Sequence, residues 1–212
     1  MTLLPSSKPS LRVSVCPFPL VHLIRVRRSV TVALITATLG LAQGGLSADL
    51  PPGAISFPGA ERARCSAESR YEVAYRVPPP AQGNHQLVLQ DRTNGKRTPL
   101  LAFDRHAEVL WSPDCEALAV TDWYGSDGSR VLVFGVPGAA PVADIGKAIE
   151  GQLGRLPSLF GNHHVYLQAV AWPEAATIRV RATGYGEVDP NGFEAFFRYE
   201  LAGKIHAEAP PK

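Results

Sequence analysis

Short runs of alternating apolar and polar residues, each closed by a turn sequence, recur along most of this chain. Alternation with a period of two is typical of strands that bury one face. It predicts strands over residues 71–77, 86–90, 98–103, 107–111, 117–122, 130–134, 165–172, 177–183 and 193–201. The Asn94-Gly95 pair supplies the left-handed turn of a hairpin between the second and third of them. The pattern therefore predicts a mostly β domain built from antiparallel hairpins.

A single amphipathic helix is expected over residues 141–153. Pro141 suits the first turn of a helix, and Asp144 favours its positive end. Apolar residues recur on one face of this segment, at Val142, Ile145, Ile149 and Leu153. A helix this short needs a partner surface, so we expect it to dock on the sheets.

An aromatic residue, a tight turn and an apolar strand follow one another at Trp111-Ser112-Pro113-Asp114 and residues 118–120. In this order they resemble one blade of a TolB-like or WD-type β-propeller, over residues 106–134. Cys115 stands where such blades commonly carry glycine. The resemblance implies blade geometry more than an activity, and it places Trp111 on the core face with Val109, Leu118 and Val120.

A second unit with the same order of strand, turn and strand follows Trp172. A closed propeller needs at least four such blades. Many residues of this chain belong to its ends, its helix and its loops, so too few remain for four blades. We therefore expect an antiparallel meander of two to three propeller-blade-like units, open or incomplete and not a closed propeller, with one short helix.

The first 48 residues have the composition of a targeting segment, because they hold no acidic residue. Arg25, Arg27 and Arg28 precede an apolar run over 30–41, and small residues lead to Ala48. This order is that of a secretory signal, and the apolar run of about a dozen residues is shorter than the roughly 20 needed to span a bilayer. We expect cleavage after Ala48, with Gly44 or Gly45 as alternatives, a periplasmic or secreted protein, and no stable membrane anchor afterwards.

The remaining residues divide into three parts by composition. We expect an extended leader over 49–60, a single β-rich domain over 61–206 and a flexible tail over 207–212. The chain has 21 Lys and Arg against 19 Asp and Glu, and five of the basic residues belong to the targeting segment, so the rest carries a net charge of −3. Without a run of basic residues, no nucleic-acid partner is expected, and a protein or envelope ligand is the expected partner.

Two cysteines, Cys65 and Cys115, remain after removal of the targeting segment. Disulfides persist in oxidising compartments, so these two are candidates for a bridge. Two separate, partly buried thiols are the alternative, because the sequence does not give their separation in space.

Two interstrand loops carry the candidate binding residues. The first loop holds Trp123, Tyr124 and Asp127, and the corresponding loop of the second unit holds Tyr185, Glu187 and Asp189. If the units stack in parallel, both loops share one rim, and exposed aromatics beside carboxylates suit sugars or peptides. The alternative is that Trp123 or Tyr124 folds back onto the core.

Signatures of common chemistry do not occur in the sequence. It contains no Gly-x-Ser-x-Gly elbow, phosphate loop or dinucleotide fingerprint. His163 and His164 would point to opposite faces of a strand, so we expect no metal site, and we expect no cofactor. The favoured function is an exported, non-catalytic binding module of the cell envelope. The alternative is a hydrolase that uses Asp or His on the same rim, with His106 near Asp104 or Glu108 as one candidate base.

Overall fold

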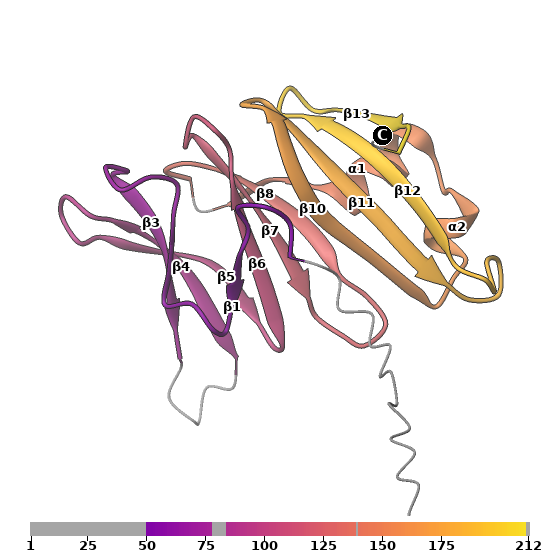
Figure 1. The fold of residues 1–212 in the computed structure, drawn as a ribbon, viewed down its shortest axis with the longest axis horizontal. Helices are drawn as coiled ribbons and strands as arrows, with labels where there is room; N and C mark the ends of the chain where they lie inside the picture. Colours follow the sequence, from indigo (N-terminus) through magenta and orange to yellow (C-terminus); the bar gives the residue numbers. More distant parts are fainter. Residues whose placement is uncertain (1–49, 78–83, 139, 211–212) are drawn as a thin grey trace, which may run out of the picture. The chain divides into compact units, whose positions relative to one another are not determined.

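The computed structural model describes residues 50–77, 84–138 and 140–210 (Figure 1). The expected targeting segment, residues 1–48, lies outside the described residues. Within the described ranges the chain is mostly antiparallel β, with two helices. Neither of these helices is long and apolar enough to cross a membrane.

Three successive meanders make up the fold, and each forms its own sheet (Figure 1). The first sheet contains β2 (Arg62–Arg64), β3 (Tyr71–Arg76), β4 (His85–Asp91) and β5 (Arg97–Phe103). The central sheet contains β6 (His106–Trp111), β7 (Ala117–Trp123), β8 (Arg130–Gly135) and β9 (Pro141–Asp144). The third sheet contains β10 (His164–Glu174), β11 (Thr177–Tyr185), β12 (Phe193–Glu200) and β13 (Lys204–Glu208). This is the expected open array of blade-like units, and it has three members.

The central sheet is buried on both of its faces. One face packs on the first sheet through Leu118, Val120 and Phe134, which we call the first core. The other face packs on the third sheet through Ala119 and Val133, which belong to the second core. Neighbouring residues of β7 point to opposite faces, and both faces are buried. The strand therefore has a continuous apolar run over 117–120, whereas a strand with one exposed face would alternate apolar and polar residues.

The segment expected to be an extended leader contributes a strand of its own. β1 (Ile55–Phe57) pairs antiparallel with β6 and extends the central sheet at that edge. Phe57 is fully buried in the first core. Proline and glycine around β1 make its sequence resemble a linker, but burial of Phe57 and pairing with β6 fix it in the domain.

The chain also stays ordered beyond the expected start of the tail at residue 207. β13 runs to Glu208, and Arg179 of β11 donates to both carboxylate oxygens of Glu208, at 2.8 and 2.7 Å. Two parallel hydrogen bonds of this kind fix the geometry of the pair as well as its charge. The last strand is therefore part of the third sheet.

The helix starts later than its sequence pattern predicts. Residues 141–144 form β9, and α1 spans Ile145–Leu153. The Asp144 side chain accepts from the backbone N–H of Lys147 at 3.3 Å, which makes Asp144 the N-cap instead of a helical residue. A second, four-residue helix, α2 (Pro157–Phe160), follows and was not expected.

Side chains cover two strand edges that would otherwise be open. Gln152 of α1 donates to the Gly203 carbonyl at 2.6 Å and accepts from the Ile205 N–H at 3.2 Å, so its amide takes the place of a neighbouring strand beside β13. Along β10, the Thr121 hydroxyl accepts from the Ala169 N–H at 3.1 Å. Edge groups occupied in this way cannot pair with another chain.

Trp111 departs from the expected burial. Val109, Leu118 and Val120 are fully buried in the first core, as the blade resemblance implies. Trp111 packs against the same core but is only half-buried, because it lies at the last position of β6. Replacing Trp111 with alanine should therefore lower the free energy of unfolding by less than replacing a fully buried aromatic residue would.

Asp91 organises the turn between β4 and β5. Arg70 Nη2 donates to Asp91 Oδ2 at 2.6 Å, and the Thr93 hydroxyl and backbone N–H donate to Asp91 Oδ1 at 2.6 and 2.9 Å. These bonds hold the pKa of Asp91 well below its usual value, and the bond from Arg70 has the largest effect. The folded state therefore resists protonation at acid pH, whereas the unfolded chain takes up the proton at about pH 4.

Asp91→Asn is expected to lower the free energy of unfolding at pH 7, with a smaller loss at pH 3. The sign follows because the stability contributed by a carboxyl with a depressed pKa is present above the unfolded pKa and is lost as the pH falls. Urea unfolding of the wild type and the variant at both pH values measures the difference. Glu68→Gln, at an exposed position, is the control. An equal loss at both pH values would show that the charge of Asp91 is not involved.

Candidate binding site at the loop rim

The candidate rim forms where the loop between β7 and β8 meets the start of β10. Gly128 and Val165 form a parallel bridge. The Val165 N–H donates to the Asp127 carbonyl at 3.0 Å, and the Ser129 N–H donates to the Val165 carbonyl at 3.3 Å. The loop of the central sheet and the third sheet are thereby joined through their backbones.

Gly128 allows this close approach. A Cβ at this position would overlap the Tyr124 hydroxyl and would lie 3.2 Å from the Val165 carbonyl oxygen. A larger residue would therefore displace the Tyr124 side chain and tighten the contact with the Val165 carbonyl. The glycine in the loop therefore has a packing role.

An aromatic strip runs across this junction. Its members are His106, Trp123, Tyr166, His164 and Tyr185. They come from the beginnings of β6 and β10 and from the ends of β7 and β11. Antiparallel neighbours reverse direction, so these positions lie at the same end of their sheets.

Ring distances show that the strip is continuous. The ring centroid of Trp123 lies 6.3 Å from that of His106 and 5.9 Å from that of Tyr166. His164 and Tyr185 stack with centroids 4.3 Å apart and planes 15° from parallel. The Tyr166 hydroxyl lies 3.5 Å from His164 Nδ1, which links the two groups of rings.

Tyr166 is tied to both sides of the junction. Its hydroxyl donates to the Ser126 carbonyl at 2.6 Å. Burial, with smaller contributions from Tyr185 and Asp127, raises the pKa of Tyr166. The tyrosine is therefore held as a neutral hydrogen-bond donor in this position.

Of the six residues predicted for the rim, the structure places two in the aromatic strip and four in the loops beside it. Trp123 and Tyr185 belong to the aromatic strip, and Tyr185 is 41% exposed. Tyr124 is 49% exposed, but it lies over its own loop against Gly128. Asp127 has its carboxylate close to Gly125, and its carbonyl joins the loop to β10. Tyr124 and Asp127 therefore shape the loop next to the strip.

Asp189 and Glu187 lie in the loop between β11 and β12, which Asn162 organises. Asn162 Nδ2 donates to Asp189 Oδ2 at 2.7 Å, and Asn162 Oδ1 accepts from the Asp189 N–H at 3.1 Å. The Asp189 carboxylate is thus hydrogen-bonded to another side chain of the protein. Glu187 is exposed and lies 3.3 Å from His163 Nε2. Of this pair, Glu187 is the one whose carboxylate faces solvent.

Asp122 lies next to Trp123 in β7 but points to the opposite face. It is buried and pairs with Arg130, whose Nη2 lies 2.9 Å from Asp122 Oδ2. Burial raises the pKa of Asp122 more than the ion pair lowers it. This carboxylate supports the base of the loop and does not reach the strip.

Sequence reasoning missed Tyr166 and the role of His164. Both lie on one face of β10 because they are two residues apart, and His164 is the register partner of Tyr185. The spacing was visible in the sequence, but the register that brings His164 to Tyr185 was not. His106 was considered only as a base, and the structure adds it to the aromatic strip.

A buried polar cluster anchors His106. Glu108 Oε1 lies 3.2 Å from His106 Nε2, and Glu108 Oε2 accepts from Gln168 Nε2 of β10 at 3.0 Å. Glu108 and Gln168 are both buried. The cluster orients the imidazole and links the central sheet to β10. Among the residues described, no group of three or more His, Cys, Asp or Glu side chains is arranged to hold a metal ion.

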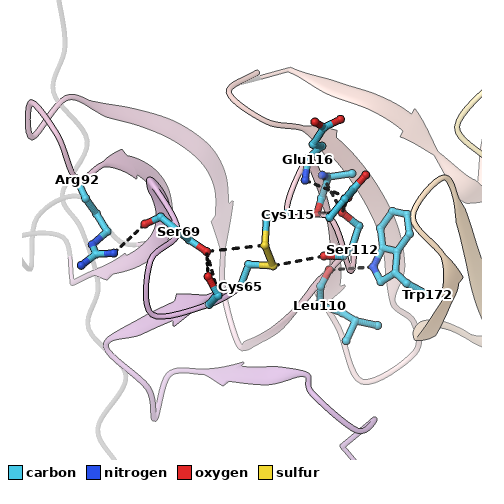
Figure 2. Close-up of a disulfide and its surroundings, with 11 residues drawn as sticks. Cys65, Ser69, Arg92, Leu110, Ser112, Cys115, Glu116 and Trp172 are labelled. Atoms are coloured by element: carbon cyan, nitrogen blue, oxygen red, sulfur yellow. Dashed lines mark hydrogen bonds between the residues drawn. A yellow bond between two sulfur atoms is a disulfide. The ribbon is translucent and has the colours of Figure 1, made fainter.

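The two candidate cysteines are joined by a disulfide in the structure (Figure 2). The bridge lies at the turn between β6 and β7, at the opposite end of these strands from His106 and Trp123. Cys65 follows β2 of the first sheet, and Cys115 lies in the turn between β6 and β7. Cys115 has φ of 63°, which is the left-handed conformation that favours glycine. The bridge therefore connects the first sheet to the turn that carries the blade resemblance.

Ser112 and Asp114 complete this turn. The Ser112 hydroxyl donates to Asp114 Oδ1 at 2.6 Å and accepts from the Ala117 N–H at 2.9 Å. Asp114 Oδ1 also accepts from the Glu116 N–H at 3.1 Å, and the bond from Ser112 is the main cause that lowers the pKa of Asp114. The Ser-Pro-Asp sequence of the turn is thus explained by its own hydrogen bonds.

No model of a known protein family matches this chain, and no curated protein matches it.

Proposed function

We propose that this protein is an exported, non-catalytic binding module of the cell envelope, whose ligand lies on the aromatic strip. The observation that carries the proposal is the gathering of five rings from two sheets into one continuous strip at a loop rim. Aromatic rings offer flat apolar faces, and tyrosine, histidine and tryptophan add polar atoms at their edges. Such surfaces hold sugar rings and peptide side chains.

The strip is supported by rigid elements. Its members lie in strands, and backbone bonds between Asp127, Ser129 and Val165 fix the junction beneath them. A surface that is already ordered loses little conformational entropy when a ligand binds. This preorganisation supports a binding role for the rim.

Export is the second part of the proposal. The arginines and the apolar run before Ala48 support a secretory signal. A bond between Cys65 and Cys115 suits a periplasmic or secreted protein, because disulfides persist there. Three stacked meanders also support a relationship to TolB-like or WD-type blades, which we propose on the blade turn at Trp111 to Asp114.

A hydrolase is the second candidate, and one observation favours it. His106 lies within hydrogen-bond distance of the buried Glu108, and it contacts Trp123 of the strip. A histidine oriented by a carboxylate is the usual geometry of a general base. In this reading, the strip would hold a substrate next to His106.

Loss of one ring from the strip is expected to weaken binding to isolated cell envelopes about thirtyfold, the effect of removing a residue that carries about 2 kcal/mol of binding energy. Tyr185→Ala should show this loss with a melting temperature close to that of the wild type, because Tyr185 is 41% exposed. Trp123→Ala should show the same loss of binding together with a lower melting temperature, because Trp123 is half-buried and its Nε1 is buried. The measurement is co-sedimentation of the purified protein with envelope preparations over a range of concentrations.

Val142→Ala is the control, because Val142 is 60% exposed on β9 and belongs neither to the strip nor to the loop beside it. It should bind as the wild type does. Equal binding by all three variants would contradict the proposal. Release of soluble envelope fragments by the wild type, lost in His106→Gln, would establish the hydrolase instead.

A further inference from the structure

Five arginines surround the face of the first sheet that points away from the central sheet. They are Arg62, Arg64, Arg76, Arg92 and Arg97, and they come from four separate places between residues 62 and 97. Val73 of β3 points into the first core, so its neighbours Glu72 and Ala74 point to this outer face. The fold therefore creates a basic face that the sequence does not show as a basic run.

One buried carboxylate lies in the middle of these arginines. Glu72 is fully buried, and its oxygens lie 3.0 Å from Arg62, 2.7 Å from Arg64 and 4.0 Å from Arg92. A single negative charge cannot balance three guanidinium groups. Positive charge is therefore left over on this face, although the exported part of the chain is acidic as a whole.

A pocket of about 340 Å³ opens beside this cluster. Its polar lining comes from Arg62, Arg76, Arg97, Gln90 and Glu61. Arg97 Nε donates to the Gln90 side-chain oxygen at 3.1 Å, which orients one guanidinium at the edge of the pocket. Three arginines against one glutamate give the pocket a positive charge.

The hollow has a structural cause in the small side chain of Ala74. Ala74 is the register partner of Arg62 on β2 and of Val88 on β4, and it is 8% exposed. The longer side chains around it rise above the sheet while Ala74 does not. Val77, which is 71% exposed, adds apolar surface to the lining, whereas the Tyr75 ring packs on Phe57 and Phe103 in the first core.

We propose that this pocket binds a phosphate group carried on a sugar-sized molecule. The planar guanidinium group matches the oxygen geometry of phosphate and can donate two hydrogen bonds at once. Arg62, Arg76 and Arg97 reach the pocket from three different strands or strand ends. The volume exceeds that of a phosphate alone, and the apolar lining suits the face of an attached ring. This site lies on the first sheet and does not depend on the function proposed for the aromatic strip.

The test is calorimetric titration of the protein with glucose 1-phosphate, with glucose and inorganic phosphate as comparison probes at the same ionic strength. We expect saturable one-to-one binding of glucose 1-phosphate, weaker binding of inorganic phosphate and no measurable binding of glucose. Arg76→Gln and Arg97→Gln should each weaken binding about tenfold, as expected for loss of a charge-assisted hydrogen bond. Ala74→Leu should fill the pocket and abolish binding.

Arg155→Gln is the matched control, since it removes the same charge from a position outside the three sheets, where Arg155 pairs with Glu150 at 3.3 Å. It should leave binding unchanged. Equal weakening by Arg155→Gln would show general charge attraction and overturn the proposal. So would an absence of saturable binding to glucose 1-phosphate, or binding only to phosphatidylglycerol vesicles or to a short DNA duplex. The two arginine variants keep the test decisive if Ala74→Leu fails to fold.

Discussion

Loss of the Cys65–Cys115 bridge is expected to lower the free energy of unfolding by about 4 kcal/mol, because the bridge closes a loop with a sequence separation of 50. Cross-linking distant residues restricts the unfolded chain, and the restriction grows with loop length. This bridge also connects the first sheet to the central sheet.

The measurement is urea unfolding of the Cys65→Ser, Cys115→Ser double variant beside the oxidised wild type. The wild type treated with a reducing agent should unfold at the same urea concentration as the double variant, and this comparison controls for the serine substitutions. Two reactive thiols in the folded, unreduced protein, or equal stability of both proteins, would contradict the expectation.

A second large effect is expected in β8, where neighbouring residues support different cores. Phe134→Ala should cost about 3–5 kcal/mol, and Val133→Ala should cost about 2 kcal/mol. Phe134 is fully buried in the first core, and Val133 is fully buried in the second. Adjacent residues of a strand point to opposite faces of the sheet. Substituting either of them with alanine can strongly lower the free energy of unfolding only when both faces are covered.

Val142→Ala is the control for this pair, because Val142 lies on the neighbouring strand β9 and is 60% exposed. It should change the free energy of unfolding by less than about 0.5 kcal/mol. The same chemical denaturation experiment serves all three variants. If Val133→Ala behaved like Val142→Ala, the third sheet would not cover the central sheet in solution.

Much of the fold could be predicted from local sequence. The Asn94-Gly95 turn and the alternation on both sides of it gave the β4–β5 hairpin, and the blade turn after Trp111 gave the β6–β7 pair. Two of the strands that were missed depend on their pairing partners, one distant in the sequence and one directly before it in the chain. Ile55–Phe57 and Lys204–Glu208 are strands because β6 and β12 pair with them, and their own sequences give little sign of this.

The helix boundary shows the same limit. Val142 has helical spacing from Ile145 and Ile149, so the pattern extended the helix to Pro141. In the structure Asp144 caps the helix, and the residues before it pair with β8. A short edge strand that is followed directly by an N-cap has the same apolar spacing as the first turn of a helix. The sequence pattern alone therefore does not separate the two.

The candidate site could be predicted in part. The sequence predicts Trp123 and Tyr185 from their loops, but His164 joins them only through the register of β10 with β11, and Tyr166 only through the packing of β10 against Trp123 of β7. Asp189 has the right residue type for a ligand contact, yet Asn162 uses its carboxylate inside the protein. Residue type indicates what a side chain can do, whereas its partners across strands decide what it does.

The most direct test of the binding role follows the side-chain N–H signals of the three tryptophans by nuclear magnetic resonance. Each lies in a different setting, since Trp111 packs on the first core, Trp172 donates to the Leu110 carbonyl at 3.1 Å, and Trp123 lies in the aromatic strip. Soluble fragments released from the cell envelope are the titrant. The proposal predicts a saturable shift of the Trp123 signal while those of Trp111 and Trp172 stay in place. Binding of the fragments with no change at Trp123 would contradict it.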